Sequence, residues 1–183
     1  PNKLSPVFHE AFTIAQDGRP GPVLIDIPKD VQFAKGSYTK KEKIIIPPHR
    51  LFKPKIFNND NKINEVVDLI SKAKKPIFYV GGGCINSGPK ASELVSQFVA
   101  MTGAPATMTL MGLGVLGSSH QNSLGMLGMH GMYEANMAMH ECDVMINIGA
   151  RFDDRVTGRL DSFSPNSKKI HIDIDESNIN KTI

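Results

Sequence analysis

The alternation of apolar strands with amphipathic helices after residue 60 restricts the fold of this chain more than any other feature. Four apolar residues at helical spacing define the face of a helix that starts near Asp60: Ile63, Val66, Val67 and Ile70. Lys75 and Pro76 end that helix, and a short apolar strand follows at residues 77–80. Alternating strands and helices are typical of parallel sheets with helices on both faces. We therefore expect an α/β fold with a doubly wound parallel sheet.

The same pattern continues to the end of the chain. A second helix is expected between Gly88 and Gly103, with Pro89 in its first turn and five residues forming its buried stripe: Ala91, Leu94, Val95, Phe98 and Val99. A Gly- and Met-rich loop is expected to run to about residue 131, before a helix that ends at Glu141. Further strands are expected at residues 104–110, 143–148 and 169–173.

The segment before residue 60 lacks this alternation. Its spacing predicts a helix over 4–16 with Gly18 as C-cap, then a strand at 22–27. Because a helix and one strand cannot bury a core, this pair is expected to be a helix-strand remnant of another α/β domain. Residues 34–59 contain prolines and lysines without periodicity, apart from a possible edge strand at 44–46. The expected parts are the end of a preceding domain (1–33), an interdomain linker (34–59) and the doubly wound domain (60–183).

Composition argues against several classes of protein. With 40% hydrophobic and 21% charged residues, the 183-residue chain has the make-up of a globular protein. A net charge of +3 is too small to argue for nucleic acid, and no apolar run has membrane-spanning length. Cys84 and Cys142 lack metal-ligand and CxxC spacing, so we expect them to be reduced and packed. The start at Pro1, without a signal peptide, is expected to be a boundary within a longer protein.

Ligands of open parallel sheets bind beyond the carboxyl ends of the strands, and unusual residues follow the strands here. Gly81, Gly82 and Gly83 follow the first strand, and they favour close approach of a ligand over a simple tight turn. A literal GxGxxG pattern occurs at 112–117, but the polar residues 118–122 open a helix poorly. We interpret that match as an ordinary loop, which argues against a standard nicotinamide-binding unit.

Residues 149–159 hold three arginines and two aspartates within eleven positions. Arginine binds phosphate or carboxylate through two parallel hydrogen bonds, yet a self-satisfied surface ion-pair cluster explains the density equally well. Asp173 and Asp175 follow the last strand, where an acid often binds a ribose hydroxyl. Asp175 alternatively suits a helix N-cap.

The histidines and methionines of the central loop do not form a metal-binding pattern. His130 and His140 have no partner at metal-ligand spacing, and a packed methionine cluster lining a pocket is the better explanation of Met126, Met129 and Met132. Nor does any Ser/His/Asp arrangement support nucleophilic catalysis. The residues alone therefore indicate a nucleotide- or phosphate-binding α/β domain without visible catalytic groups.

Four stretches resemble the acetohydroxyacid synthase (acetolactate synthase) family of thiamine-diphosphate-dependent enzymes. They are GRPGPVLIDIPKDV at 18–31, the glycines at 81–83, LGMLGMHG at 124–131 and GARFDDRVTG at 149–158. The resemblance implies the end of a pyrimidine-binding domain followed by most of a Rossmann-like central FAD-binding domain, truncated at its C-terminal side. The family's catalytic glutamate and metal–diphosphate motif are not in this sequence, so the chain is expected to be inactive alone.

The resemblance also implies roles for individual residues. Flavin contacts are expected at Arg19, Gly81, Gly82, Gly83, Thr109, Leu110, Met111, Leu127, Gly128, Met129, His130, Gly149, Ala150, Arg151, Asp153, Arg155, Val156, Asp173 and Ile174. The substrate channel is expected to include Lys29, Met129, Asp154 and Arg155. Arg155 is expected to hold the carboxylate of the acceptor 2-ketoacid, with Asp154 keeping it in position.

The implied reaction decarboxylates pyruvate on thiamine diphosphate with Mg²⁺ and joins the two-carbon fragment to pyruvate or 2-ketobutyrate, for branched-chain amino-acid synthesis. The implied assembly is a homodimer or tetramer, with a possible small regulatory subunit and without nucleic acid or membrane. The expected location is the cytoplasm of a bacterium, or an organelle in a eukaryote. The alternatives are a non-catalytic nucleotide-binding module and a related enzyme such as glyoxylate carboligase or pyruvate oxidase.

Overall fold

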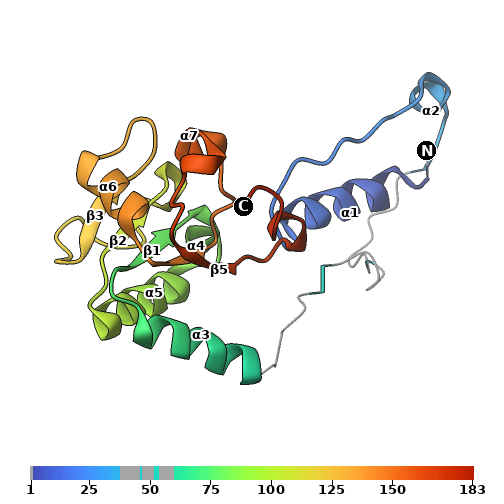
Figure 1. The fold of residues 1–183 in the computed structure, drawn as a ribbon. Coiled ribbons are helices and arrows are strands. Elements are labelled where there is room, and N and C mark those ends of the chain that lie inside the picture. The colour runs from blue at the N-terminus through green and yellow to red at the C-terminus, as the bar shows by residue number, and fades with distance from the viewer. Residues whose placement is uncertain (1, 38–45, 47–51, 54–59) are drawn as a thin grey trace. The chain divides into compact units, whose positions relative to one another are not determined.

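The structure is a computed structural model that describes residues 2–37, 46, 52–53 and 60–183 (Figure 1). The chain divides into two compact units, residues 1–57 and 58–183. Most of the expected linker, and two of the three residues of the possible edge strand at 44–46, lie outside the described residues.

Two helices form the regular structure of the first unit, α1 (Leu4–Gln16) and α2 (Lys29–Phe33). The expected helix over residues 4–16 is confirmed. Gly18 follows its C-cap, Asp17, with a left-handed φ of +58°, a conformation that favours glycine. The N–H of Gly21 donates to the carbonyl of Ala15 at 3.0 Å and turns the chain away from the helix.

The predicted strand at residues 22–27 is absent from the structure. This segment has no strand partner among the described residues, and its Leu24 side chain is 92% exposed. A strand forms only where a neighbour satisfies its backbone N–H and C=O groups, and the apolar run by itself does not supply that neighbour.

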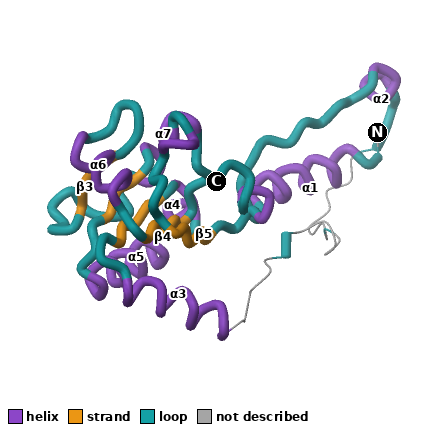
Figure 2. Tube along the Cα trace, viewed as in Figure 1, coloured by secondary structure: helices purple, strands orange, loops and turns teal. Residues whose placement is uncertain are grey.

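The second unit is built on one five-stranded, all-parallel sheet with the order β3-β2-β1-β4-β5. Figure 2 shows the strands of this sheet in orange. Its strands are β1 (Pro76–Val80), β2 (Ala106–Met108), β3 (Ser123–Met126), β4 (Val144–Ile148) and β5 (Lys168–Ile172). Its α-helices are α3 (Asp60–Lys72), α4 (Gly82–Asn86), α5 (Pro89–Thr102), α6 (Tyr133–Glu141) and α7 (Asp154–Thr157). Three 3₁₀ turns complete it, at Leu110–Gly112, Leu160–Ser162 and Glu176–Asn178.

Helices cover both faces of this sheet, which confirms the expected doubly wound α/β fold (Figure 1). On one face Phe78 and Val80 of β1 pack against Val95 and Val99 of α5, with α3 beside them. On the other face the alternate β1 residues pack against α6 and the segment after β4. Strands buried on both faces read as continuous apolar runs, which explains why β1 and β4 were visible in the sequence.

The structure departs from the sequence-based expectation at β3 and α4. β3 lies inside the expected Gly- and Met-rich loop, where its four half-buried residues carry a glycine at a φ of +73°. Such a short edge strand has neither alternation nor a long apolar run to reveal it. α4 begins within the glycine run at 81–83, where the sequence predicted close approach of a ligand and no separate helix.

Candidate functional site

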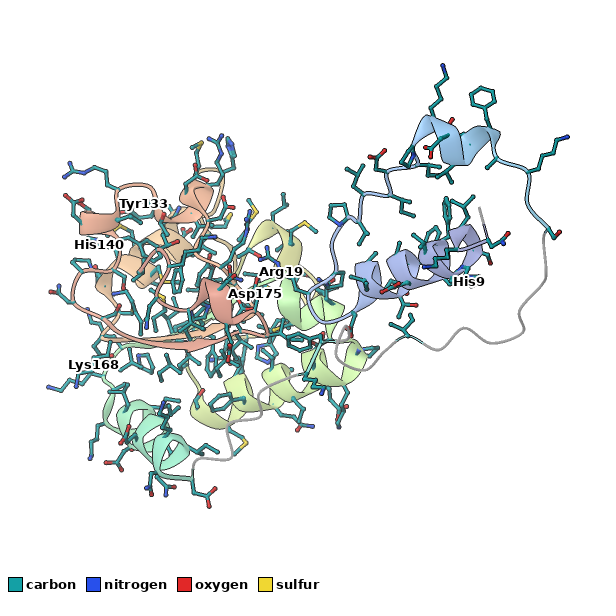
Figure 3. All side chains as sticks on the ribbon, turned by 90° about the vertical axis from the view of Figure 1, so that its right-hand side faces the viewer. His9, Arg19, Tyr133, His140, Lys168 and Asp175 are labelled. Carbon is teal, nitrogen blue, oxygen red and sulfur yellow. The ribbon has the colours of Figure 1, made fainter. Side chains whose placement is uncertain are left out.

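The carboxyl ends of the strands form one edge of the sheet in the second unit. Figure 3 shows Lys168 at one end of β5 and Asp175 beyond the other, which marks the direction that all five strands share. The strand order reverses between β1 and β4, and ligands of doubly wound sheets bind at such a switch point. The loops after β1 and β4 are therefore the first place to look for a site.

These two loops pack directly against each other through glycine backbone. The N–H of Gly83 donates to the carbonyl of Gly149 at 3.0 Å, and the N–H of Gly81 donates to Ile148 at 2.9 Å. A Cβ on Gly81 would lie 2.1 Å from the Gly149 oxygen, and one on Gly82 would lie 2.9 Å from Cβ of Met111. Packing within the protein thus requires glycine in this run, so the run is not by itself a sign of a ligand.

The GxGxxG match at 112–117 leads through turns into β3, and no helix lies between the match and that strand. A Cβ on Gly112 would lie 2.5 Å from the carbonyl oxygen of Val80, so this glycine also serves backbone packing. The interpretation of the match as an ordinary loop is confirmed.

The arginine-rich loop after β4 divides into paired and unpaired cations. Arg151 bonds the carboxylate of Asp153, and Arg159 donates to Asp161 at 2.7 Å, so these two arginines fit the ion-pair alternative. The exposed guanidinium of Arg155 makes no hydrogen bond or ion pair with the described residues. In particular it has no bond to Asp154, so the expectation that Asp154 positions Arg155 is not supported by this structure.

Asp153 links this loop to helix α7. Its carboxylate caps the helix by accepting the N–H of Arg155 at 3.1 Å. That backbone bond, with the nearby charge of Arg151, lowers the pKa of Asp153 below its ordinary value. The loop therefore presents the Arg155 side chain from the first turn of a helix whose cap is anionic at neutral pH.

The acids after β5 are bound within the protein. Asp173 accepts the N–H of Asp175 at 2.8 Å and the amide of Asn178 at 3.2 Å, and its side chain is 8% exposed. Asp175 accepts the N–H of Ser177 at 3.0 Å and caps the 3₁₀ turn that follows. The N-cap alternative is thus confirmed for Asp175. A ribose hydroxyl at Asp173 would have to share a carboxylate that already accepts hydrogen bonds from Asp175 and Asn178.

The expected packed methionine cluster is wrong, because Met129 and Met132 are 64% and 56% exposed. No group of three or more potential metal ligands occurs within the described ranges. Cys84 and Cys142 are buried and unbridged as expected, and burial raises the pKa of Cys84 to about 11. Among the described helices, none combines the length and apolar character needed to cross a bilayer.

The expected site residues of the second unit lie around the carboxyl edge of the sheet, and they differ in their exposure to solvent. The exposed ones are Leu110, Met111, Met129, His130, Arg151, Asp154, Arg155 and Ile174. The half-buried ones are Gly82, Gly83, Thr109, Gly149, Asp153, Val156 and Asp173, and the buried ones are Gly81, Leu127, Gly128 and Ala150. Arg19 and Lys29 are exposed residues of the first unit, and their part in a site stays a prediction.

The sequence analysis did not identify the residues within β4 and β5 whose side chains hydrogen-bond to the loop at this edge. Asn147 is fully buried in β4 and bonds both backbone groups of Ala150, at 2.6 and 3.1 Å. His171 of β5 reaches the carbonyl of the same residue at 3.1 Å. The available signal was a polar side chain within an otherwise apolar strand, because a buried amide needs partners.

Comparison with known proteins agrees with this geometry. The chain is 44% identical over 183 residues to the acetolactate synthase isozyme 2 large subunit of Escherichia coli, covering 98% of this chain and 31% of that protein. It is 45% identical over 175 residues to the chloroplastic acetolactate synthase of Arabidopsis thaliana, covering 96% and 25%. It is 46% identical over 181 residues to the acetolactate synthase large subunit of Corynebacterium glutamicum, covering 99% and 28%.

These relatives confirm the resemblance seen in the sequence motifs, and the chain spans between a quarter and a third of their length. The family model described as the thiamine pyrophosphate enzyme, central domain, matches residues 63–183. That range holds the whole five-stranded sheet and every loop at its carboxyl edge. The chain belongs to the family of thiamine pyrophosphate enzyme central domains.

Proposed function

We propose that this chain is the central part of an acetolactate synthase that joins two 2-ketoacids with loss of CO₂, for branched-chain amino-acid biosynthesis. The support is the 44–46% identity to acetolactate synthases over almost the entire chain. Thiamine diphosphate and Mg²⁺ are the cofactors of the whole enzyme, held by residues outside this chain. When bound, thiamine diphosphate supplies the carbanion chemistry, and the protein supplies binding, orientation and charge.

FAD is the cofactor proposed for the carboxyl edge of the sheet. Four apolar side chains there are exposed and suit a flat aromatic ring: Leu110, Met111, Met129 and Ile174, at 69%, 74%, 64% and 47%. The guanidiniums of Arg151 and Arg155, both at the surface of the adjoining loop, suit the diphosphate. Because Leu127, Gly128 and Ala150 are buried, they can offer a flavin little beyond backbone atoms.

Arg155 is the residue that we propose to recognise the acceptor 2-ketoacid. The observation behind this role is that its guanidinium has no ion pair with described residues, whereas Arg151 and Arg159 are paired. An exposed guanidinium next to apolar side chains can bind a carboxylate through two parallel hydrogen bonds. Met129 and Asp154 are proposed to line the substrate channel with Arg155, although Asp154 does not bond Arg155 in this structure. A channel role for Lys29, in the first unit, stays a prediction.

The proposed assembly follows from the relatives. The names of the Escherichia coli and Corynebacterium glutamicum proteins contain the words large subunit, which supports a smaller partner for the enzyme proposed here. We propose a homodimer or tetramer of the catalytic chain. Its proposed location is the cytoplasm of a bacterium, or an organelle if the source is eukaryotic, as for the chloroplastic relative.

The test compares Arg155→Lys with Arg151→Lys in the full-length protein that contains this chain. Lysine keeps the charge but loses the planar fork, so ligation to 2-ketobutyrate should fall about ten- to hundredfold for Arg155→Lys at saturating FAD, as expected for a lost charge-assisted hydrogen bond. Donor decarboxylation should change less, because the donor carboxylate leaves before the acceptor binds. The matched Arg151→Lys variant should mainly weaken FAD binding.

Two results would contradict this proposal. If acceptor preference between 2-ketobutyrate and pyruvate is unchanged in Arg155→Lys, the residue is a flavin ligand only. If the full-length protein makes no acetolactate from pyruvate with thiamine diphosphate, Mg²⁺ and FAD, the proposed activity itself is wrong. The isolated chain should stay at background in the same assay and bind FAD weakly, since it lacks the family's catalytic glutamate and diphosphate motif.

A further inference from the structure

A row of polar and aromatic side chains crosses the sheet just below its carboxyl edge. Strand register places Thr107 beside Tyr79, Tyr79 beside Asn147, and Asn147 beside His171. Each occupies the penultimate position of its strand, on β2, β1, β4 and β5. The first three are fully buried. Polar groups on a buried sheet face are costly unless they find partners. The Tyr79 hydroxyl has no partner among the described residues, so the function of the row is indicated by the hydrogen bonds of the other three side chains.

Two members of the row, Asn147 and His171, hydrogen-bond to Ala150 in the loop after β4. The side-chain amide of Asn147 donates to the carbonyl of Ala150 at 2.6 Å, and its oxygen accepts the N–H of Ala150 at 3.1 Å. Nε2 of His171 lies 3.1 Å from the same carbonyl. Thr107 instead donates to the carbonyl of Gly125 at 3.0 Å, in the edge strand β3.

The loop after β4 has an unusual backbone conformation on both sides of Ala150. Ala150 lies between Gly149, at a φ of +66°, and Phe152, a non-glycine residue at a φ of +55°. A non-glycine residue keeps a positive φ only where its surroundings hold it. The ring of Phe152 packs edge-to-face on His171, with centroids 5.1 Å apart, and lies 5.6 Å from the ring of Tyr79. Backbone and side chain of this loop are thus both fixed by the row.

We propose that Asn147 and His171 are positioning residues, which hold Ala150 and Phe152 so that Arg151 and Arg155 face the bound ligand. The two arginines flank Phe152 in the chain, so a change in its backbone angles redirects both guanidiniums. The consequence for the ligand rests on the proposed function, since FAD and the 2-ketoacid are its ligands. The restraint on the loop itself does not depend on that function.

The test uses Asn147→Asp in the full-length protein, which preserves shape but replaces the donor to Ala150 with a carboxylate oxygen. Thr107→Val is the matched control, because it removes a part-buried hydrogen bond of the same row that goes from β2 to the edge strand β3 and not to the loop after β4. FAD affinity is measured by flavin fluorescence quenching. Trypsin cleavage after Arg151 and Arg155 is measured by mass spectrometry, and thermal unfolding serves to match the two variants in stability.

Asn147→Asp should weaken FAD binding on the order of tenfold or more, as expected when ligand contacts are misplaced, and should accelerate cleavage after both arginines by a similar factor. Thr107→Val should leave both within about twofold at a comparable loss of thermal stability. If Asn147→Asp does not fold, His171→Phe, which keeps a ring against Phe152, should shift both readouts in the same direction.

Equal effects of the Asn147 and Thr107 variants on affinity and cleavage would overturn the proposal, since they would reflect general destabilisation. Unchanged cleavage after Arg151 and Arg155 in Asn147→Asp would overturn it as well, even if wild-type protein binds FAD. Absence of FAD binding by the wild-type protein would contradict the proposed function instead, and the cleavage comparison would still decide whether Asn147 restrains the loop.

Discussion

Each unit of this chain contains a short, mainly apolar run, but only the run in the second unit forms a β-strand. Residues 77–80 form all of β1 except its first residue, and Ile77, Phe78 and Val80 are at most 1% exposed. Residues 22–27 are apolar except for Asp26, yet they pair with no described strand, and Leu24 is 92% exposed. The difference is that β1 has β2 and β4 on either side. An apolar run becomes a strand only where the chain also supplies its neighbours.

The first unit shows the same lack of partners in its side chains. Ala11 is its only buried residue among those described, whereas Phe12 and Phe33 are 66% and 76% exposed. Exposed apolar surface of this kind marks a contact made elsewhere. It therefore supports the proposal that residues 1–33 complete a sheet whose other strands belong to a preceding domain.

The largest expected effect tests whether only the second unit has a core. Phe78→Ala should lower the free energy of unfolding by about 3–5 kcal/mol, because Phe78 is fully buried and its ring packs on Phe98 at 5.0 Å. Phe33→Ala should cost less than about 1 kcal/mol, the scale of its exposed contact with Lys29. Urea unfolding followed by circular dichroism measures both. A similar loss in the two variants would contradict the contrast between the units.

A smaller effect tests whether the backbone of the second unit is as tightly packed as its core. Gly103 and Gly149 have the same left-handed φ, +67° and +66°, but a Cβ on Gly103 meets nothing within 4 Å. Gly103→Ala should therefore cost about 1–2 kcal/mol from conformation alone. Gly149→Ala should cost at least about 1 kcal/mol more, because its Cβ would lie 2.9 Å from Cα of Gly83. Equal unfolding free energies for the two variants would show that the loops separate easily.

The smallest effect concerns a side-chain helix cap, which α4, α5 and α6 of the second unit lack as well. Neither α1 nor α2 has a side-chain cap, whereas Asp153 caps α7. Asp153→Ala should cost about 1 kcal/mol at pH 7. Because the folded-state pKa of Asp153 is lowered, this stabilisation is complete above the unfolded pKa of about 4 and is lost as the pH falls through the folded value. Unfolding curves of the variant and the wild type should therefore converge in acid, and a pH-independent gap would rule out the charged cap.

Prediction from the sequence succeeded where burial leaves a periodic pattern. α1, α3, α5, β1, β4 and β5 were all expected close to their observed bounds. β3 was missed because a four-residue edge strand containing a glycine leaves no such pattern. The candidate site was anticipated as a place, the carboxyl edge after β1, β4 and β5, from topology rules and family motifs. Which of its three arginines is unpaired was not anticipated, because the sequence shows density of charge but not distance.

What the sequence determined by itself is the alternation of elements, since apolar periodicity records which faces must leave water. The family motifs at 124–131 and 149–158 likewise required no coordinates. Only the tertiary structure decided that the glycines after β1 are needed against Gly149, and that Asn147 and His171 meet at Ala150. The physical reason is that hydrogen bonds and close backbone contacts join residues distant in the chain, and their geometry exists only once the sheet has aligned its strands.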